Sequence, residues 1–303
     1  MKMHRILAEG AAEILKAVFR ERRVLDGVLA EAFEENPRWG KRDRNFIAST
    51  VFEVVRWRRA LAFVADCEEI TALCAAQWRR MGYDIPEWWH HRGTTAEDMA
   101  EREAKLAEQP RAVRESIPDW LDEVGQRQLG AAWEREISAL NRPARVFLRI
   151  NRLKATREQV IIWLRSHGIE VEGVEGLEDA LVLPVGAMLP KELRADGRVE
   201  IQDAGSQMIA PMLKVEPGQK IIDACSGAGG KALHLASLMG NQGRIYAMDI
   251  TAAKLVELER RARRAGASCI QMRQINDDTA RDFAGMADGL LIDSPCTGLG
   301  TLR

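Results

Sequence analysis

The residues best suited to covalent chemistry in this 303-residue chain are Asp293 and Cys296, in a turn that reads Asp-Ser-Pro-Cys. The turn follows the apolar run GLLI, which is typical of a buried strand. A thiolate that adds to carbon 6 of a cytosine makes carbon 5 nucleophilic enough to take a methyl group. The turn therefore predicts a catalytic role for Cys296, with a buried structural thiol as the alternative.

A glycine-rich loop is the second candidate site. It follows the strand pattern KIIDA and precedes a helix pattern that begins at about Ala232. Glycines let the backbone turn sharply and approach a ligand, and the helix N-terminus offers free N–H donors. The loop is not a Walker A loop, but it fits G-x-G-x-x-A, so a nicotinamide-binding site stays open as an alternative. We expect cofactor contacts from Cys225, Ser226, Gly227, Ala228, Gly229, Gly230 and Lys231.

Aspartates follow the next strand patterns. Asp249 ends RIYAMDI, where a carboxylate can accept both ribose hydroxyls of an adenosine, and a helix N-cap is the alternative interpretation. After the third strand pattern, Asp278 is preferred over Asp277 as the partner of an adenine amino group. Asp293 completes the predicted cofactor set. Because hydride transfer has no use for a thiol beside a carboxylate, the turn at 293–296 favours methyl transfer.

Hydrophobic periodicity predicts the elements that position these residues. Residues 201–303 alternate strands with helices, which indicates an α/β domain with a doubly wound parallel sheet. Residues 141–200 read strand, helix, strand and predict a small α+β module. Residues 1–140 carry apolar residues at three- and four-residue spacing and predict an all-helical domain. Within it, residues 82–118 are expected to form a mostly exposed connector.

Composition limits the partners and the class of protein. The hydrophobic content of 46% is sufficient for folded domains. The sequence has no apolar run long enough to span a membrane, so we expect a cytoplasmic protein. We also expect a monomer. Five cysteines without a C-x-x-C pair predict neither a disulfide framework nor a metal site. Adjacent histidines in Trp88-Trp89-His90-His91 favour packing over metal binding.

The net charge of −1 hides a segregation along the chain. Residues 1–60 carry +4 and residues 61–140 carry −7. A cluster of six basic residues around an apolar helical stripe is compatible with phosphate binding, although a solvated helix face explains it equally well. The cluster consists of Lys41, Arg42, Arg44, Arg56, Arg58 and Arg59.

These motifs resemble those of the Sun/Fmu-type (RsmB/NOP family) RNA 5-methylcytosine methyltransferases. DACSGAGGK is similar to the family's Asp-Ala-Cys-Ala-Ala-Pro-Gly-Gly-Lys cofactor loop, with Ala228 where proline is usual. Asp249 and Asp278 resemble the next two cofactor carboxylates, and residues 293–298 resemble Asp-Ala-Pro-Cys-Ser-Gly. Two further segments, FLRINRLK and VEIQDAGSQMIAP, resemble the segments with which the family's α+β module and methyltransferase domain begin. A third, DRNFIASTVFEVVRWRR, resembles part of a NusB-like RNA-binding domain.

The resemblance implies a Rossmann-like methyltransferase sheet, S-adenosyl-L-methionine as cofactor, and methyl transfer to a cytosine of RNA, ribosomal RNA in particular. It also implies a cysteine–cytosine covalent adduct. In the family the nucleophile is a second cysteine, in a Thr-Cys-Ser motif beyond the Pro-Cys turn, and the Pro-Cys thiol helps release the product. Since the sequence ends at Arg303, we expect a truncated chain with an incomplete sheet. Two hypotheses stay open beside activity through Cys296: a non-enzymatic RNA-binding protein with a vestigial methyltransferase domain, and a nicotinamide dehydrogenase.

Overall fold

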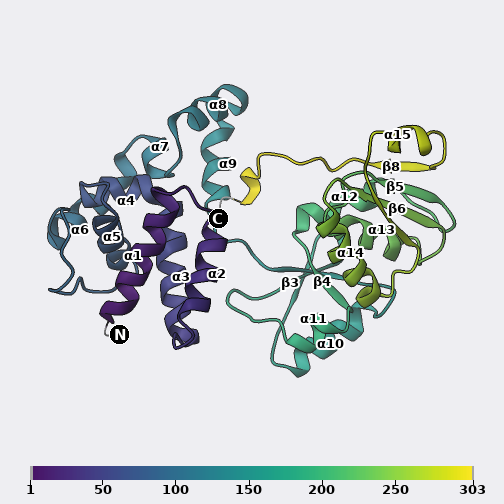
Figure 1. The fold of residues 1–303 in the computed structure, drawn as a ribbon, viewed down its shortest axis with the longest axis horizontal. Helices are drawn as coiled ribbons and strands as arrows, with labels where there is room; N and C mark the ends of the chain where they lie inside the picture. The colour runs from purple at the N-terminus through teal and green to yellow at the C-terminus, as the bar shows by residue number, and fades with distance from the viewer. Residues whose placement is uncertain (1–2, 302–303) are drawn as a thin grey trace. The chain divides into compact units, whose positions relative to one another are not determined.

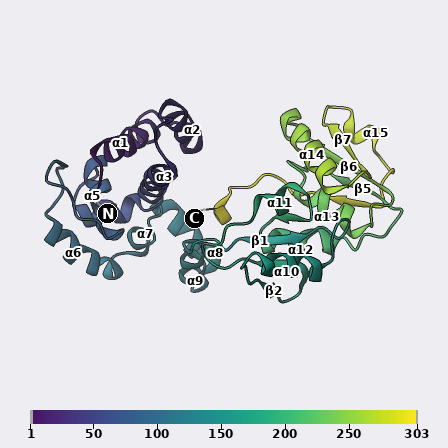
Figure 2. The same cartoon turned by 90° about the horizontal axis from the view of Figure 1, so that it is seen from below.

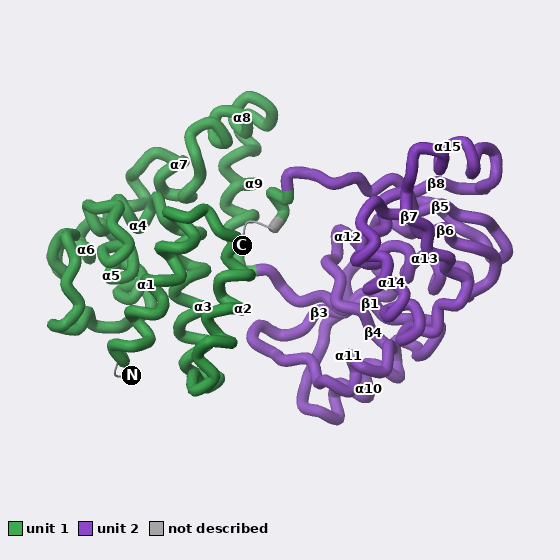
Figure 3. The backbone as a smooth tube through the Cα atoms, in the orientation of Figure 1, with its two compact units in different colours: residues 1–143, 298–303 green, residues 144–297 purple. Residues whose placement is uncertain are grey.

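A computed structural model describes residues 3–301 of the chain. Figures 1 and 2 show the fold from two directions, and Figure 3 shows its division into two compact units. The first unit contains the chain up to Pro143 together with the segment from Gly298, and the second contains Ala144–Thr297.

The first unit is helical, as the three- and four-residue periodicity predicts. Its core is continuous across the first five helices. Trp78 is fully buried there, stacks on Phe46, and donates its indole N–H to Thr50 Oγ1 at 3.1 Å. The helices are α1 (Arg5–Phe19), α2 (Leu25–Glu35), α3 (Lys41–Arg56), α4 (Arg58–Ala65), α5 (Ile70–Arg80), α6 (Ala96–Ala104), η1 (Leu106–Glu108), α7 (Arg111–Arg114), α8 (Asp119–Leu129), α9 (Ala132–Leu140) and η2 (Leu299–Thr301).

The segment 82–118 differs from the exposed connector expected of it. It contains α6 and α7, and it contributes the buried side chains of Trp89 and Met99 to the main core of the unit. Trp89 meets the Trp78 ring edge to face and donates its indole N–H to the carbonyl of Thr71 at 3.0 Å. Aliphatic residues are few in this segment, so the periodicity is weak, but single large side chains fill the core. The packing role expected for Trp89 agrees with these contacts.

Several basic side chains of α3 and α4 make contacts within the unit. Arg56 donates to the carbonyls of Ser116 and Glu115 at 3.0 and 3.1 Å. Arg59 donates to the carbonyl of Ile117 at 2.9 Å. Arg44 donates to two carbonyls of the α2–α3 region at 2.9 and 3.1 Å. The contacts of Arg56 and Arg59 join segments that lie 58 to 60 residues apart in sequence. Phosphate binding by the basic cluster stays a prediction.

The second unit begins with an antiparallel sheet. The strands are β1 (Phe147–Ile150), β2 (Glu172–Val174), β3 (Leu177–Val182) and β4 (Val199–Ile201), in the order β2-β3-β1-β4. The helix α10 (Arg157–Ser166) covers it, beginning at a Thr156–Gln159 capping box, and α11 (Lys191–Ala195) precedes β4. A buried cluster containing Leu148, Val160 and Leu164 holds the helix on the sheet.

The second sheet of this unit is parallel, in the order β7-β6-β5-β8. Its apolar core lies between the strands and α12, α13 and α14, and a smaller apolar cluster around Tyr246 and Phe283 covers the opposite face beside α15. The alternation of strands and helices predicted from residue 201 is therefore confirmed. The elements are α12 (Ala204–Met212), β5 (Lys220–Asp223), α13 (Gly230–Leu238), β6 (Arg244–Asp249), α14 (Ala252–Ala265), β7 (Ile270–Gln274), α15 (Thr279–Asp282) and β8 (Gly289–Leu291).

Candidate functional site

The predicted site residues of the α/β domain follow the carboxyl ends of the parallel strands. Strand β5 ends at Asp223 and β6 at Asp249, while β8 runs into the loop that holds Asp293. Strand β5 pairs with β6 on one side and with β8 on the other, so the chain order reverses at β5. In open α/β sheets a crevice for ligands forms outside the carboxyl ends of the strands at such a reversal. The topology therefore brings the predicted residues to one edge.

The glycine loop between β5 and α13 has a backbone that only glycine adopts easily. Gly227 and Gly229 have φ of +53° and +88°, in the left-handed region. A Cβ at Gly229 would lie 1.9 Å from Cδ1 of Leu258 on α14, so the loop can pack this closely only without a side chain there. Ser226 ties the loop to β6, because its backbone N–H donates to the carbonyl of Met248 at 2.8 Å. The loop is thus a preformed cradle at the N-terminus of α13.

Asp249 is buried beside this loop and is positioned by backbone donors. Its Oδ2 accepts from the N–H of Gly227 at 3.0 Å, and its Oδ1 accepts from the N–H of Thr251 at 2.8 Å. The alternative interpretation of Asp249 from the sequence is a helix N-cap. The bond from Thr251 N–H shows that the carboxylate supports the start of α14, although Thr251 and not Asp249 is the N-cap residue. A carboxylate has about four acceptor positions. Asp249 therefore retains the capacity to accept from a ligand's hydroxyl groups while it holds both turns.

Lys231 and Asp293 form an ion pair across the same edge. Lys231 is largely covered and Asp293 is about half exposed. The pair joins the first turn of α13 to the loop after β8, two segments that are 62 residues apart. The spacing of the two motifs in the sequence could not predict this contact.

Asp223 is a further candidate that we did not predict from the sequence. Its side chain is 1% exposed, and neither carboxylate oxygen forms a hydrogen bond at normal distance with the residues that the structure describes. Burial raises the pKa of Asp223 to about 6, although the backbone of Cys225 and the charge of Lys231 oppose the rise. A buried carboxylate without a partner is costly and marks a place where a ligand's donor or positive charge would be stabilised. Its position at the end of β5, directly before the glycine loop, could have indicated from the sequence that Asp223 belongs to the site.

The remaining predicted residues lie in more open positions. Cys296 is exposed in the segment after β8, and Cys225 is partly covered inside the glycine loop. Asp278 precedes α15 and pairs with Arg281 at 2.6 Å, while Asp277 is exposed. Two further cysteines differ in burial: Cys74 is fully buried, which raises the pKa of its thiol to about 12, and Cys269 is partly buried.

A buried network of charges supports the loop from behind. Glu200 on β4 is 5% exposed and accepts from Arg261 and Arg264 of α14 at 2.8 and 2.7 Å. Arg261 also donates to the carbonyl of Ala228 at 2.8 Å, and Arg149 of β1 donates to the carbonyl of Gly230 at 2.6 Å. Two carbonyls of the glycine loop are therefore fixed by guanidinium groups, one of which comes from the antiparallel sheet. The sequence offered no signal for this network, since its members come from three separate elements.

Two other features are absent from residues 3–301. None of the helices in that range is long and apolar enough to cross a membrane. No group of three or more His, Cys, Asp or Glu side chains is placed there to hold a metal ion.

Comparison with known protein families gives two matches. The family described as 16S rRNA methyltransferase RsmB/F matches residues 210–303. The RsmF/B-like ferredoxin-like domain matches residues 117–187. The matched residues contain the glycine loop and the Pro-Cys turn.

Relatives with curated names are similar to the chain at moderate identity. A probable ribosomal RNA small subunit methyltransferase B of Synechocystis sp. is 34% identical over 62% of this chain and 43% of its own length. The ribosomal RNA small subunit methyltransferase B of Xanthomonas campestris is 28% identical over 97% of this chain and 73% of its own length. The chain spans less than half the length of several curated relatives that it matches.

Solved structures share the fold. One, titled PH0851, superposes with a TM-score of 0.72 at 20% identity and covers all of this chain and 78% of that one. Another, NSun6 from Pyrococcus horikoshii with the ligand SFG, gives a TM-score of 0.55 at 21% identity and covers 61% of this chain and 72% of that one.

Proposed function

We propose that the chain transfers a methyl group from S-adenosyl-L-methionine to carbon 5 of a cytosine in RNA, because RsmB/F methyltransferase family models match residues 117–187 and 210–303. Ribosomal RNA is the proposed substrate class, since the curated relatives are named ribosomal RNA methyltransferases. The observation that carries the proposal is the charge of the sheet edge. Asp223, Asp249 and Asp293 meet there around a glycine cradle, with Lys231 as a partner of Asp293.

This charge favours a cationic cofactor over a dinucleotide. S-Adenosylmethionine carries a sulfonium and an ammonium group, whereas the pyrophosphate of a nicotinamide cofactor is an anion that would lie against the same loop. The buried carboxylate of Asp223 lacks a hydrogen-bond partner at normal distance among residues 3–301 and would be stabilised by a positive charge. An acidic edge thus argues against the dehydrogenase hypothesis.

We assign the cofactor-binding role to residues 225–231 and to four carboxylates. Asp249 accepts from the ribose hydroxyls, and Asp278 meets the adenine amino group. Asp223 and Asp293 supply negative charge beside the loop. When bound, the cofactor supplies an electrophilic methyl group. The preformed left-handed turns at Gly227 and Gly229 lower the cost of binding, because the loop need not reorganise.

Cys296 is assigned as the catalytic thiol. In this proposal Cys296 takes the attacking role that the family resemblance gives to a second cysteine beyond the Pro-Cys turn. Its thiolate attacks carbon 6 of the target cytosine, which forms a carbon–sulfur bond and moves the electrons of the 5,6 double bond to carbon 5. After methylation, carbon 5 loses its proton to a base, and elimination breaks the carbon–sulfur bond and restores the thiolate. The target base leaves its stack to reach the thiol. The exposure of Cys296 supports this role, because an RNA base must reach the sulfur.

Three other properties accompany this function as proposals. The helical first unit binds RNA, with the basic cluster on α3 and α4 as the expected contact. The protein works in the cytoplasm as a monomer.

Transfer of a radiolabelled methyl group to ribosomal RNA tests the proposal directly. The wild-type chain is expected to label cytosine, and Cys296→Ala is expected to abolish labelling while leaving S-adenosylmethionine binding unchanged. RNA containing 5-fluorocytosine should trap a covalent adduct, because fluorine at carbon 5 blocks the final elimination.

Cys67→Ala is the matched control, since Cys67 is a partly buried cysteine of the helical unit. Labelling that survives Cys296→Ala would overturn the role of this thiol. RNA binding without any S-adenosylmethionine binding would instead favour a non-enzymatic RNA-binding protein.

A further inference from the structure

One buried arginine outside the predicted site contacts the glycine loop. Arg149 lies on β1 of the antiparallel sheet and is 1% exposed. Its Nη1 donates to the carbonyl of Gly230 at 2.6 Å and also to Oε1 of Gln202. Gly230 is the first residue of α13, so the bond from Arg149 reaches the point where the loop becomes a helix.

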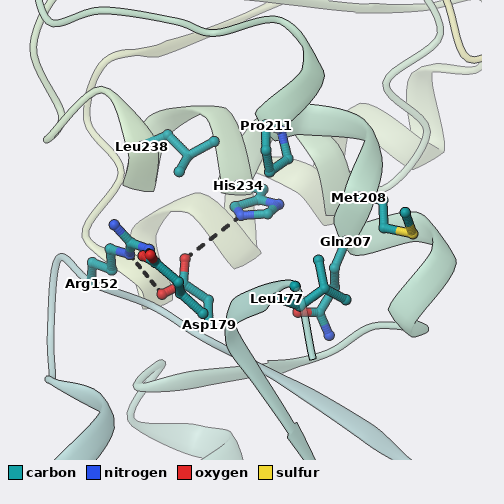
Figure 4. A pocket seen from close by; sticks show the side chains of 10 residues that line it. Arg152, Leu177, Asp179, Gln207, Met208, Pro211, His234 and Leu238 are labelled. Atoms are coloured by element: carbon teal, nitrogen blue, oxygen red, sulfur yellow. Dashed lines mark hydrogen bonds and ion pairs between the residues drawn. The ribbon is translucent and has the colours of Figure 1, made fainter. Parts of the chain in front are cut away.

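The antiparallel sheet also holds α13 further along its length. The backbone N–H of Arg152, just after β1, donates to Oγ of Ser237 near the end of the helix at 3.0 Å. Asp179 of β3 accepts from Arg152 Nε at 2.6 Å, and its other carboxylate oxygen lies 3.8 Å from Nε2 of His234. Figure 4 shows both contacts of Asp179 as dashed lines. The sheet therefore contacts α13 at its start, its middle and its end.

The end of α14 is held from the same segment of the chain. Asn151 is 4% exposed, and its Nδ2 donates to the carbonyl of Ala265 on α14 at 2.8 Å. The same Nδ2 donates to the carbonyl of Gly197 at 2.8 Å. Residues 149–152 are thus anchored to both helices that pack against the glycine loop. A side chain on this anchored segment can hold the loop in one position.

Arg149 is an unfavourable residue for stability alone. Burial lowers the pKa of Arg149 to about 10, although the charge of Glu200 opposes the change. Its Nε forms no hydrogen bond with any residue between positions 3 and 301. Its charge also lies against the N-terminal end of α13, where the helix dipole is positive. Because a well-packed apolar side chain often stabilises a core at least as well as a buried charge, these costs point to a role in ordering the loop.

The planarity of the peptide bond explains how this contact affects the ligand side of the loop. The carbonyl of Gly230 and the N–H of Lys231 belong to one rigid peptide plane, so fixing the carbonyl also fixes the direction of the N–H. That N–H is one of the first donors of α13, which have no partner inside the helix. Glycine-rich backbone has many alternative conformations, so an unsupported loop would lose more entropy on binding a ligand.

We propose that Arg149 is a positioning residue of the cofactor site, which keeps the glycine loop in its binding conformation by holding the carbonyl of Gly230. It acts through the loop and touches neither the cofactor nor the RNA. This inference rests on the proposed function. It makes the antiparallel sheet a part of the cofactor site, because the guanidinium that orders the start of α13 comes from that sheet and not from the parallel one.

Calorimetry with S-adenosylmethionine on the full chain tests the role of Arg149. Arg149→Met removes the donors and keeps most of the side-chain volume, so the dissociation constant should rise about tenfold or more, because the loop must then be ordered during binding. The KM for S-adenosylmethionine should rise by the same factor, while kcat stays within about twofold, since the reacting groups are unchanged. Arg149→Lys keeps the buried charge without the planar fork and should raise the dissociation constant about threefold. It keeps the test valid where Arg149→Met does not fold.

Leu148→Val is the matched control, because it shortens a fully buried side chain of the same strand that packs in the apolar core of the antiparallel sheet. It should lower the thermal midpoint and leave the dissociation constant unchanged. A loss of affinity in Leu148→Val equal to that in Arg149→Met would overturn the proposal, because the stability of the sheet alone would then explain both.

Amide hydrogen exchange of residues 224–235 without ligand gives a second readout. Exchange should be faster in Arg149→Met than in the wild type, because the loop opens more often without the guanidinium. Equal exchange in the two proteins would overturn the proposal. Wild-type affinity for S-adenosylmethionine in Arg149→Met would overturn this inference and leave the proposed function standing. A wild-type chain that binds no S-adenosylmethionine would overturn both, so the two failures are distinguishable.

Discussion

Replacement of Asp223 by asparagine should make the protein more stable at pH 8 and weaken its cofactor binding. The carboxylate of Asp223 is buried and has no hydrogen-bond partner at normal distance in the described range of the chain. Burial raises the pKa of Asp223 from 3.8 to about 6. Since a tenfold change in a protonation equilibrium is worth about 1.4 kcal/mol, this rise corresponds to about 3 kcal/mol of native-state destabilisation when the carboxylate is ionised.

The sign of the pH dependence follows from proton binding. The folded state binds the proton of Asp223 more tightly than the unfolded state does, so the free energy of unfolding falls as the pH rises from about 4 to about 6. Above about pH 6 the carboxylate is ionised in both states, and the free energy of unfolding falls no further. An asparagine side chain at this position is neutral at every pH in the range, so Asp223→Asn should match the wild type near pH 4 and exceed its stability by up to about 3 kcal/mol at pH 8.

Urea denaturation of the wild type and Asp223→Asn between pH 4 and pH 8 measures this difference. Asp277→Asn is the control, because Asp277 is an exposed acid near the same edge of the sheet. A stability difference that does not grow with pH, or that Asp277→Asn reproduces, would refute the account of a costly buried charge.

The same substitution should reduce the affinity for S-adenosylmethionine. A hydrogen bond to a charged group contributes about 1.5–3 kcal/mol, so its loss corresponds to a dissociation constant about ten to a hundred times larger. The thermal shift that the cofactor produces should be smaller for Asp223→Asn than for the wild type, even though the unliganded variant is the more stable protein. Unchanged affinity would remove Asp223 from the cofactor site.

Other substitutions test the support of the loop and the local folding of the antiparallel module. Glu200→Gln should lower the free energy of unfolding by about 3 kcal/mol in urea denaturation, because it removes the buried counter-charge of two partly covered guanidinium groups. Glu257→Gln, at an exposed pair, should leave the free energy of unfolding unchanged. Gly229→Ala should lower the free energy of unfolding by about 2–4 kcal/mol and weaken cofactor binding in calorimetry, because the backbone there is left-handed and the added Cβ would clash with Leu258. A fully stable variant with normal cofactor affinity would contradict this. Thr156→Ala should lower the free energy of unfolding by about 1 kcal/mol, because it removes the capping box of α10. A fall in the urea midpoint measures this loss, and an unchanged midpoint would show that the cap contributes little.

Much of the fold could be predicted because its signals are local. The run KIIDA, the glycines after it and the apolar stripe of α13 each specify their own conformation, and the structure places β5, the loop and α13 accordingly. The order of strands and helices likewise follows from the period of the apolar residues. The segment 82–118 was less predictable, because its core contacts depend on isolated residues such as Trp89 and Met99 and not on a periodic pattern.

The sequence by itself determined the residue types that could do the chemistry, their order along the chain, and the parallel sheet whose carboxyl ends collect them. Only the tertiary structure decided the electrostatics of that edge. The burial that raises the pKa of Asp223, the pairing of Lys231 with Asp293, and the contacts of Arg149 and Arg261 with the loop all join residues tens of positions apart or depend on enclosure by distant elements. Burial and charge pairing depend on which residues are neighbours in space, so they cannot be inferred from a pattern along the sequence. The same holds for the contacts of α13 with the antiparallel sheet, because residues tens of positions apart meet there only on folding.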